Sequence, residues 1–205
     1  DLLNHGKSKK GYTKLNFQNL KKQLNDLVRY LKVEKFNLIG FSIGAIIAQY
    51  FAIKYQNKIN NLILIASIYK RSPEEILKVK KRYKILVKGE SISEDSIKRW
   101  FNIEYLKKNP KTYKFFYDIR KKNKNADFLP AYKAFVNAKN YKLNFSNLNV
   151  PTLIMTGEND VGSTPKMNKM LNKKIKNSKI YIIPKAKHMA IFEKSKLIND
   201  KINKF

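Results

Sequence analysis

The sequence of 205 residues predicts an α/β fold, in which a mostly parallel sheet is flanked by helices and carries a helical insertion. Short apolar runs without polar alternation, such as residues 62–66, are typical of strands that are covered on both faces. Amphipathic helical patterns separate these runs, and this alternation of strand and helix favours parallel pairing. Between residues 68 and 142 the strand pattern stops, and lysine- and tyrosine-rich helical segments follow one another.

Two helices and two strands are expected before the insertion. After a polar loop over residues 1–12, Asn16 is placed to cap a helix of about four turns. The apolar stripe of this helix recurs every three or four residues, at Phe17, Leu20, Leu24, Leu27, Val28 and Leu31. The run 36–39 ends at Gly40 and a helical pattern starts at Ile43, which predicts a strand, a sharp turn and a second helix. The run 62–66 predicts the next strand.

The insertion has clear helix starts. Ser72, Pro73 and the acids at 74–75 offer an N-cap, a proline at the first helical position and negative charge in the first turn; residues 93–95 and 109–110 repeat this logic. Beyond the insertion, residues 151–156 and 180–183 predict strands, a helix opens at 164–165, and a last helix closes the chain. We therefore expect a core of residues 1–67 and 143–205 that carries a helical lid of residues 68–142.

Residues 40–44, Gly-Phe-Ser-Ile-Gly, match the pattern G-x-S-x-G, which presents a serine hydroxyl at a strand-to-helix corner. We expect both glycines to be needed, because a side chain at either position would collide with neighbouring backbone. By chance alone the pattern arises in roughly one chain of this length in fifteen. Its place between an apolar run and a helix favours Ser42 as a nucleophile over a structural turn.

A serine nucleophile needs a base, and the base needs a carboxylate. His188 follows the last predicted strand, on a loop at the carboxyl end where parallel sheets place their sites, so it is the predicted base; the alternative is a solvated loop histidine. His5, in the opening loop, is expected to have no catalytic role. Asp160 comes directly after the strand 151–156 and completes the order Ser, Asp, His, with Glu158 as the competing carboxylate.

Composition limits the partners and the compartment. The net charge of +29 suggests a polyanion, but the lysines are spread over every segment without an arginine-rich block, so we attribute them to a general bias in composition and regard a nucleic-acid partner as unfavoured. The absence of cysteine excludes disulfides and thiolate metal sites, and no apolar stretch approaches the roughly 20 residues of a membrane span. We expect a cytoplasmic protein without metal or organic cofactor.

The chain resembles the lidded α/β-hydrolases, and most of all the 3-oxoadipate enol-lactonase branch. The resemblance is carried by DLLNHGKS at 1–8, by 37–67, by TGENDVGSTP at 156–165 and by the segment around His188; Arg99-Trp100-Phe101 resembles the lactonase lid more loosely. It implies that the backbone amide of Ile43 is one oxyanion donor. It also implies that the first strands and the second oxyanion donor precede residue 1. Without that second donor, this fragment would lose roughly 10²- to 10³-fold in reaction rate.

These observations predict a serine hydrolase that cleaves a carboxylic ester or lactone of a small molecule by acyl transfer. The same three side chains also serve hydrolases of thioesters and carbon–carbon bonds. Trp100 and Phe101 are the preferred residues for an apolar pocket, although the aromatic residues of the lid could equally pack its helices. The lysine excess favours an anionic substrate only weakly, because the charge is spread. The alternative from another class is a non-catalytic binding protein with an anionic partner.

Overall fold

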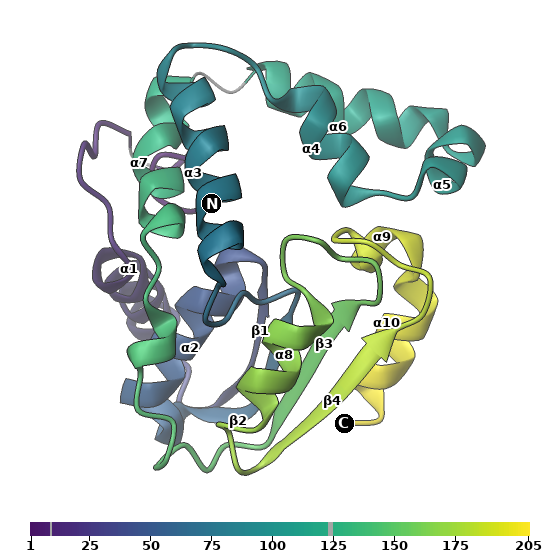
Figure 1. Cartoon of the computed structure of the whole chain (residues 1–205). Helices are drawn as coiled ribbons and strands as arrows, with labels where there is room; N and C mark the ends of the chain where they lie inside the picture. Colours follow the sequence, from purple (N-terminus) through teal and green to yellow (C-terminus); the bar gives the residue numbers. More distant parts are fainter. Residues whose placement is uncertain (9, 123–124) are drawn as a thin grey trace.

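The computed structural model describes residues 1–8, 10–122 and 125–205, and its centre is a four-stranded parallel sheet with the order β1-β2-β3-β4 (Figure 1). The strands are β1 (Phe36–Phe41), β2 (Ile59–Ile65), β3 (Thr152–Gly157) and β4 (Ser178–Ile183). Every run that was expected to form a strand does so, with ends that differ by up to three residues. The predicted α/β fold is therefore confirmed.

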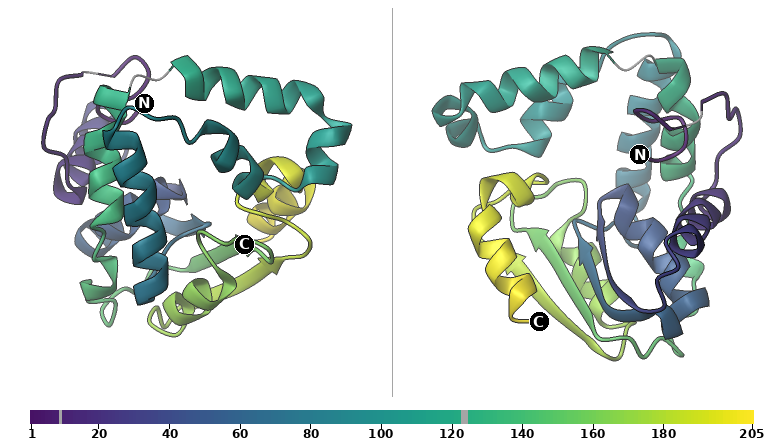
Figure 2. Two further views of the ribbon diagram at one scale, coloured as in Figure 1. Left: turned by 45° about the horizontal axis from the view of Figure 1, so that its top comes forward. Right: turned by 180° about the vertical axis from the view of Figure 1, so that it is seen from behind.

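Helices cover both faces of the sheet (Figure 2). On one face lie α1 (Phe17–Tyr30), α2 (Ile43–Tyr55) and α8 (Pro165–Asn172), and on the other lie α9 (Ala190–Glu193) and α10 (Ser195–Asn203). Successive residues of β2 alternate between the two cores: Leu62 and Leu64 belong to the first, and Ile63 and Ile65 to the second. Because both faces are buried there, residues 62–65 of this strand are apolar without interruption.

The segment between β2 and β3 is helical throughout its described elements. It contains α3 (Pro73–Val87), α4 (Ser93–Trp100), α5 (Ile103–Lys108), α6 (Pro110–Lys122), α7 (Asn125–Val136) and a 3-10 turn at Asn140–Lys142. Another 3-10 turn, Gln56–Lys58, lies between α2 and β2. Helix α3 packs against α7, and α4 packs against α6. Ser72 caps α3 as expected, because its hydroxyl accepts from the amide of Glu75 while the Glu75 side chain accepts from the Ser72 amide.

The helices α4 to α6 sit over the carboxyl ends of the strands (Figure 1). Their apolar core includes Ile97 and Phe101 and packs against Phe41 at the end of β1 and Met189 in the loop after β4. The Met189 amide also donates a hydrogen bond of 2.8 Å to the Trp100 carbonyl. The inserted helices therefore contact the end of β1 and the loop after β4, at the two edges of the sheet. No helix in the described part of the chain combines the length and apolarity needed to cross a membrane.

Candidate active site

Ser42 forms the corner between β1 and α2, because the strand ends at Phe41 and the helix begins at Ile43. Its backbone has φ 54° and ψ −116°, a conformation that costs a non-glycine residue about 1–3 kcal/mol. Two hydrogen bonds hold the corner: the Ser42 amide donates to the Ile65 carbonyl at 2.9 Å, and the Ala45 amide donates to the Ser42 carbonyl at 3.0 Å. The sheet and the helix together thus impose the strained turn.

The two glycines of the corner differ in what surrounds them. A Cβ on Gly40 would lie 2.6 Å from the Gly44 carbonyl oxygen and 2.7 Å from the Cα of Ala45, so the strand and the helix approach too closely for any side chain. A Cβ on Gly44 would meet nothing within 4 Å. The expectation that both glycines are needed is right for Gly40 and wrong for Gly44, because the crowding lies on one side of the corner only.

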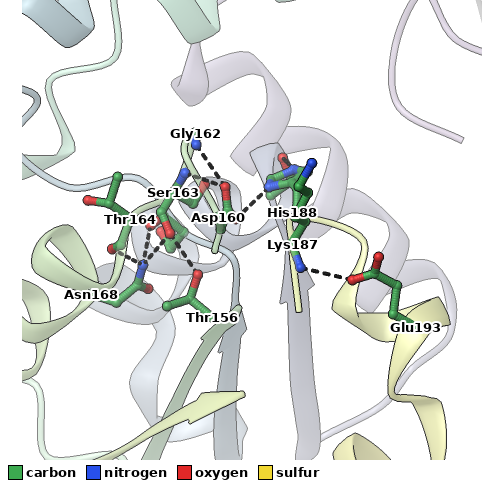
Figure 3. Close-up of polar contacts among 11 residues, drawn as sticks. Thr156, Asp160, Gly162, Ser163, Thr164, Asn168, Lys187, His188 and Glu193 are labelled. Carbon is green, nitrogen blue, oxygen red and sulfur yellow. Dashed lines mark hydrogen bonds and ion pairs between the residues drawn. The ribbon is translucent and has the colours of Figure 1, made fainter. Parts of the chain in front are cut away.

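The structure brings together the three side chains that were predicted to act together. His188 Nε2 lies 3.1 Å from Ser42 Oγ. His188 Nδ1 lies 2.8 Å from Asp160 Oδ2, a contact that Figure 3 shows. With its proton on Nδ1, the imidazole donates to Asp160 and accepts the hydrogen of the Ser42 hydroxyl on Nε2. The ring of Phe41 flanks His188, with centroids 5.3 Å apart. This arrangement can move a proton from the serine to the imidazole.

Asp160 is almost fully buried, with 2% of its surface exposed. Burial alone would raise its pKa, but the charge of His188 and hydrogen bonds from His188, Ser163 and Gly162 outweigh burial, so the pKa is lowered. Its Oδ1 accepts from the Gly162 amide at 2.8 Å and the Ser163 amide at 2.9 Å. The competing carboxylate, Glu158, is exposed and instead accepts from the backbone amide at position 185.

A buried polar network holds the loop that carries Asp160 (Figure 3). The Thr156 hydroxyl donates to the Ser163 carbonyl at 2.6 Å. The Asn168 side-chain amide donates to the carbonyls of Ser67, Ser163 and Thr164 at 3.0, 3.1 and 3.0 Å. Because Asn168 is completely buried at the start of α8, it ties this loop to the helix and to the segment after β2.

The loop that carries His188 crosses directly over the end of β3. A Cβ on Gly157 would lie 2.4 Å from the carbonyl oxygens of both Ala186 and Lys187. On the far side of the loop, the Glu193 carboxylate accepts from the Lys187 amide at 2.8 Å and from the backbone amide of Asn102, at the start of α5. The position of His188 therefore depends on β3 beneath it and on the inserted helices beside it.

A cavity of about 1640 Å³ opens onto Ser42, Ile43 and His188. The aromatic residues of the inserted helices divide between this cavity and the helix core. Those that line the cavity are Trp100, Phe128, Tyr132 and Phe135. Those that pack in the core of α4 to α6 are Phe101, Tyr105, Tyr113, Phe116 and Tyr117, and Trp100 also packs against this core. Phe101 is fully buried and does not line the cavity, because its ring stacks on Tyr105 and faces away into the helix core. His5 also lines the cavity, and its Nδ1 lies 2.9 Å from the Leu3 carbonyl oxygen.

Four arginines that sequence reasoning did not single out as a group also line the cavity: Arg71, Arg82, Arg99 and Arg120. Their rarity is the sequence feature that could have identified them, because only five of the 44 lysine and arginine residues are arginine. Within the residues that the structure describes, no three His, Asp or Glu side chains are grouped as metal ligands would be.

Comparisons with known proteins identify the family and the fold. Residues 1–195 match the family model described as the alpha/beta hydrolase fold. The chain is 23% identical over 192 residues to (E)-2-((N-methylformamido)methylene)succinate hydrolase of Acinetobacter baylyi, covering 92% of this chain and 72% of that protein. Among solved structures, it resembles the enol-lactonase of Burkholderia xenovorans (TM-score 0.83, 19% identity, 100% of this chain and 78% of that one) and a thermophilic esterase of Thermogutta terrifontis (TM-score 0.85, 22% identity, 100% and 76%). The resemblance seen in the sequence is confirmed, and the chain belongs to the α/β-hydrolase family.

Proposed function

We propose that this protein is a serine hydrolase that cleaves a carboxylic ester or a lactone by acyl transfer. The observation that carries the proposal is the distance of 3.1 Å between Ser42 Oγ and His188 Nε2, with Asp160 on the other ring nitrogen, at the edge of a cavity. The classes of the relatives, a hydrolase, an enol-lactonase and an esterase, support the same reaction. We refer to Ser42, His188 and Asp160 as the triad.

In the proposed reaction the Ser42 oxygen attacks the carbonyl carbon while His188 Nε2 takes the hydroxyl proton. The amide of Ile43 begins α2, so it has no partner one turn earlier in the helix and is free to stabilise the oxyanion, together with the positive end of the helix dipole. The imidazolium, stabilised by Asp160, then gives its proton to the leaving alkoxide oxygen. Water attacks the acyl-serine in a second round, and the acid is released.

The inserted helices are proposed to act as a lid over this reaction. Trp100 is the residue of the lid that we place against the acyl group, because it lines the cavity and its carbonyl holds the amide of Met189 next to His188. Closing an apolar wall over the triad would exclude water from the oxyanion and strengthen the hydrogen bond from the Ile43 amide. A small-molecule ester or lactone fits such an enclosed site.

A fluorophosphonate probe tests the proposal, because it reacts covalently only with an activated serine. The protein, expressed from its complete reading frame, should be labelled, and labelling should vanish in Ser42→Ala and fall steeply in His188→Ala. Ser146→Ala, at an exposed serine outside the cavity, serves as the matched control and should be labelled like the parent. A folded parent that takes no label would contradict the proposal and favour a non-catalytic binding protein. A panel of p-nitrophenyl esters, enol-lactones and thioesters then identifies the bond that is cleaved.

A further inference from the structure

Arginine is concentrated in the cavity to a degree that the rest of the chain does not share. The chain has 39 lysines and five arginines, and four of the five arginines line this cavity. They come from separate places in the fold: Arg71 precedes α3, Arg82 lies in α3, Arg99 in α4 and Arg120 in α6. The fifth, Arg29, is exposed on α1. In a chain that uses lysine for nearly every positive charge, a guanidinium at these four positions indicates a need for its planar, forked donors.

These four residues, which we call the arginine cluster, have no acidic partners of their own. None of the ion pairs formed by the described residues includes an arginine. Of the four carboxylates that line the cavity, three are already used by other groups: Glu75 by the cap of α3, Glu158 by the Lys185 amide and Asp160 by His188. The fourth, Glu74, is exposed. The positive charge of the cluster is therefore not neutralised within the described part of the protein.

The donors of the cluster are also largely unused. Each guanidinium has five N–H groups. Among the described residues, Arg82 donates to the Tyr132 hydroxyl at 3.4 Å and Arg99 to the Ser96 hydroxyl at 3.2 Å. Arg71 donates through Nη1 to the carbonyls of Phe135 and Val136, at 2.9 and 3.3 Å. Within the described residues, Nη2 of Arg71 and the Nε atoms of Arg99 and Arg120 are buried without a hydrogen-bond partner. Buried polar groups are normally paired, so these atoms indicate that a partner is missing.

Burial makes this arrangement of guanidinium groups costly. It lowers the pKa of Arg71 to about 10 and also lowers the pKa of Arg99 and Arg120, and the nearby charge of Arg82 adds to the effect on Arg71 and Arg99. A guanidinium is not deprotonated in proteins, so the cluster keeps its positive charge. Partly desolvated like charges repel one another, and an anion placed among them would remove both the repulsion and the loss of hydration.

We propose that the arginine cluster binds a carboxylate of the substrate, so that the hydrolase acts on an ester or lactone that carries a second, anionic end. The inference rests on the proposed function and adds the chemical class of its substrate. Trp100, Phe128 and Phe135 line the same cavity and would contact the apolar middle of such a molecule. Arg99 precedes Trp100 at the end of α4, and both residues line the cavity.

Binding can be measured without turnover. In Ser42→Ala protein, the thermal midpoint should rise with monomethyl glutarate, which has one carboxylate, and should not rise with dimethyl glutarate. The rise should be lost when Arg82→Gln or Arg99→Gln is added and kept when Arg29→Gln is added as the matched control. Equal shifts with both esters, or no shift with either, would overturn the inference. A larger shift with inorganic phosphate than with monomethyl glutarate would overturn the assignment to a carboxylate. Each variant's midpoint without ligand shows whether it has folded.

Kinetics separates this inference from the proposed function. The parent should hydrolyse mono-p-nitrophenyl glutarate with a higher kcat/KM than the neutral p-nitrophenyl valerate. Losing one charge-assisted hydrogen bond should reduce that preference by roughly 10- to 100-fold in Arg99→Gln. Arg29→Gln, which lies outside the cavity, should keep both the preference and the turnover of the valerate. Equal turnover of the two esters by the parent would overturn the carboxylate subsite and leave the hydrolase intact. Absence of turnover and of probe labelling would count against the hydrolase itself.

Discussion

Substituting Gly157 with alanine should disable the proposed triad without touching any of its side chains. The added Cβ would lie 2.4 Å from the carbonyl oxygens of Ala186 and Lys187, whereas ordinary van der Waals contact begins at 3.4 Å. Because both obstacles are backbone atoms, no side-chain rotation can relieve the clash. The loop must move by about 1 Å, and His188 is the next residue along it.

That displacement is large compared with the tolerances of the site. His188 Nε2 lies 3.1 Å from Ser42 Oγ, and a hydrogen bond at more than 3.5 Å is lost. A misplacement of about 1 Å can cost an enzyme roughly 10²-fold in rate. Overpacking typically costs about 1–3 kcal/mol of stability, so Gly157→Ala should fold with a lower thermal midpoint. We expect a far greater loss of activity than of structure.

The rate of fluorophosphonate labelling, compared with the thermal midpoint, is the assay for this variant. Gly44→Ala is the matched control, because its Cβ would meet nothing within 4 Å and alanine favours a helix, so labelling and stability should be preserved or slightly raised. A folded Gly157→Ala protein that is labelled as fast as the parent would refute the reasoning. It would mean that the loop yields without moving His188.

Three further predictions concern the groups around the triad. Asp160→Asn should lower kcat by roughly 10⁴-fold. Because the folded protein holds the pKa of Asp160 below its ordinary value, ionised Asp160 stabilises the fold above that ordinary value, and this stabilisation is lost as the pH falls through the folded pKa. Urea midpoints measured between about pH 6 and pH 2 should therefore fall more steeply for the parent than for Asp160→Asn. Asn168→Ala removes the buried side-chain amide that donates to the carbonyls of Ser67, Ser163 and Thr164, and it should cost about 1–3 kcal/mol in chemical unfolding. The exposed Asn177→Ala should change stability by less than about 0.5 kcal/mol. Glu193→Ala removes the acceptor of the Lys187 amide and should slow labelling by about 10-fold, and Glu193→Gln, which keeps one acceptor oxygen, should slow it less.

The fold and the triad could be predicted because their signals are local. The strands of a doubly covered sheet are continuous apolar runs, and the caps at Asn16, Ser72 and Thr164 lie at the starts of the helices they were expected to begin. Ser93 is a small exception: it is the first residue of its helix, and Ile92 precedes it as the cap. The carboxyl ends of parallel strands share one edge of the sheet, so residues directly after β1, β3 and β4 could be expected to meet.

What could not be predicted depends on contacts between distant segments. Whether Trp100 or Phe101 faces the cavity depends on the rotation of α4 against α6, which an aromatic-rich sequence does not specify. The difference between Gly40 and Gly44 depends on which side of the corner the helix backbone passes. The arginine cluster is dispersed along the chain between residues 71 and 120, and only the packing of the inserted helices around one cavity brings its members together.

The geometry of the sheet explains why the site depends on a residue without a side chain. Neighbouring strands lie about 4.8 Å apart, so β1 and β4, with two strands between them, are separated by roughly 14 Å. Ser42 follows β1 immediately, and His188 therefore has to be carried back across the end of β3 by the loop after Ile183. The amide of Asn159 donates to the Ala186 carbonyl at 2.9 Å along this crossing. The backbone of this loop can approach the end of β3 so closely only because β3 ends in Gly157. The distance between the His188 imidazole and the Ser42 hydroxyl therefore depends on a position that has no side chain.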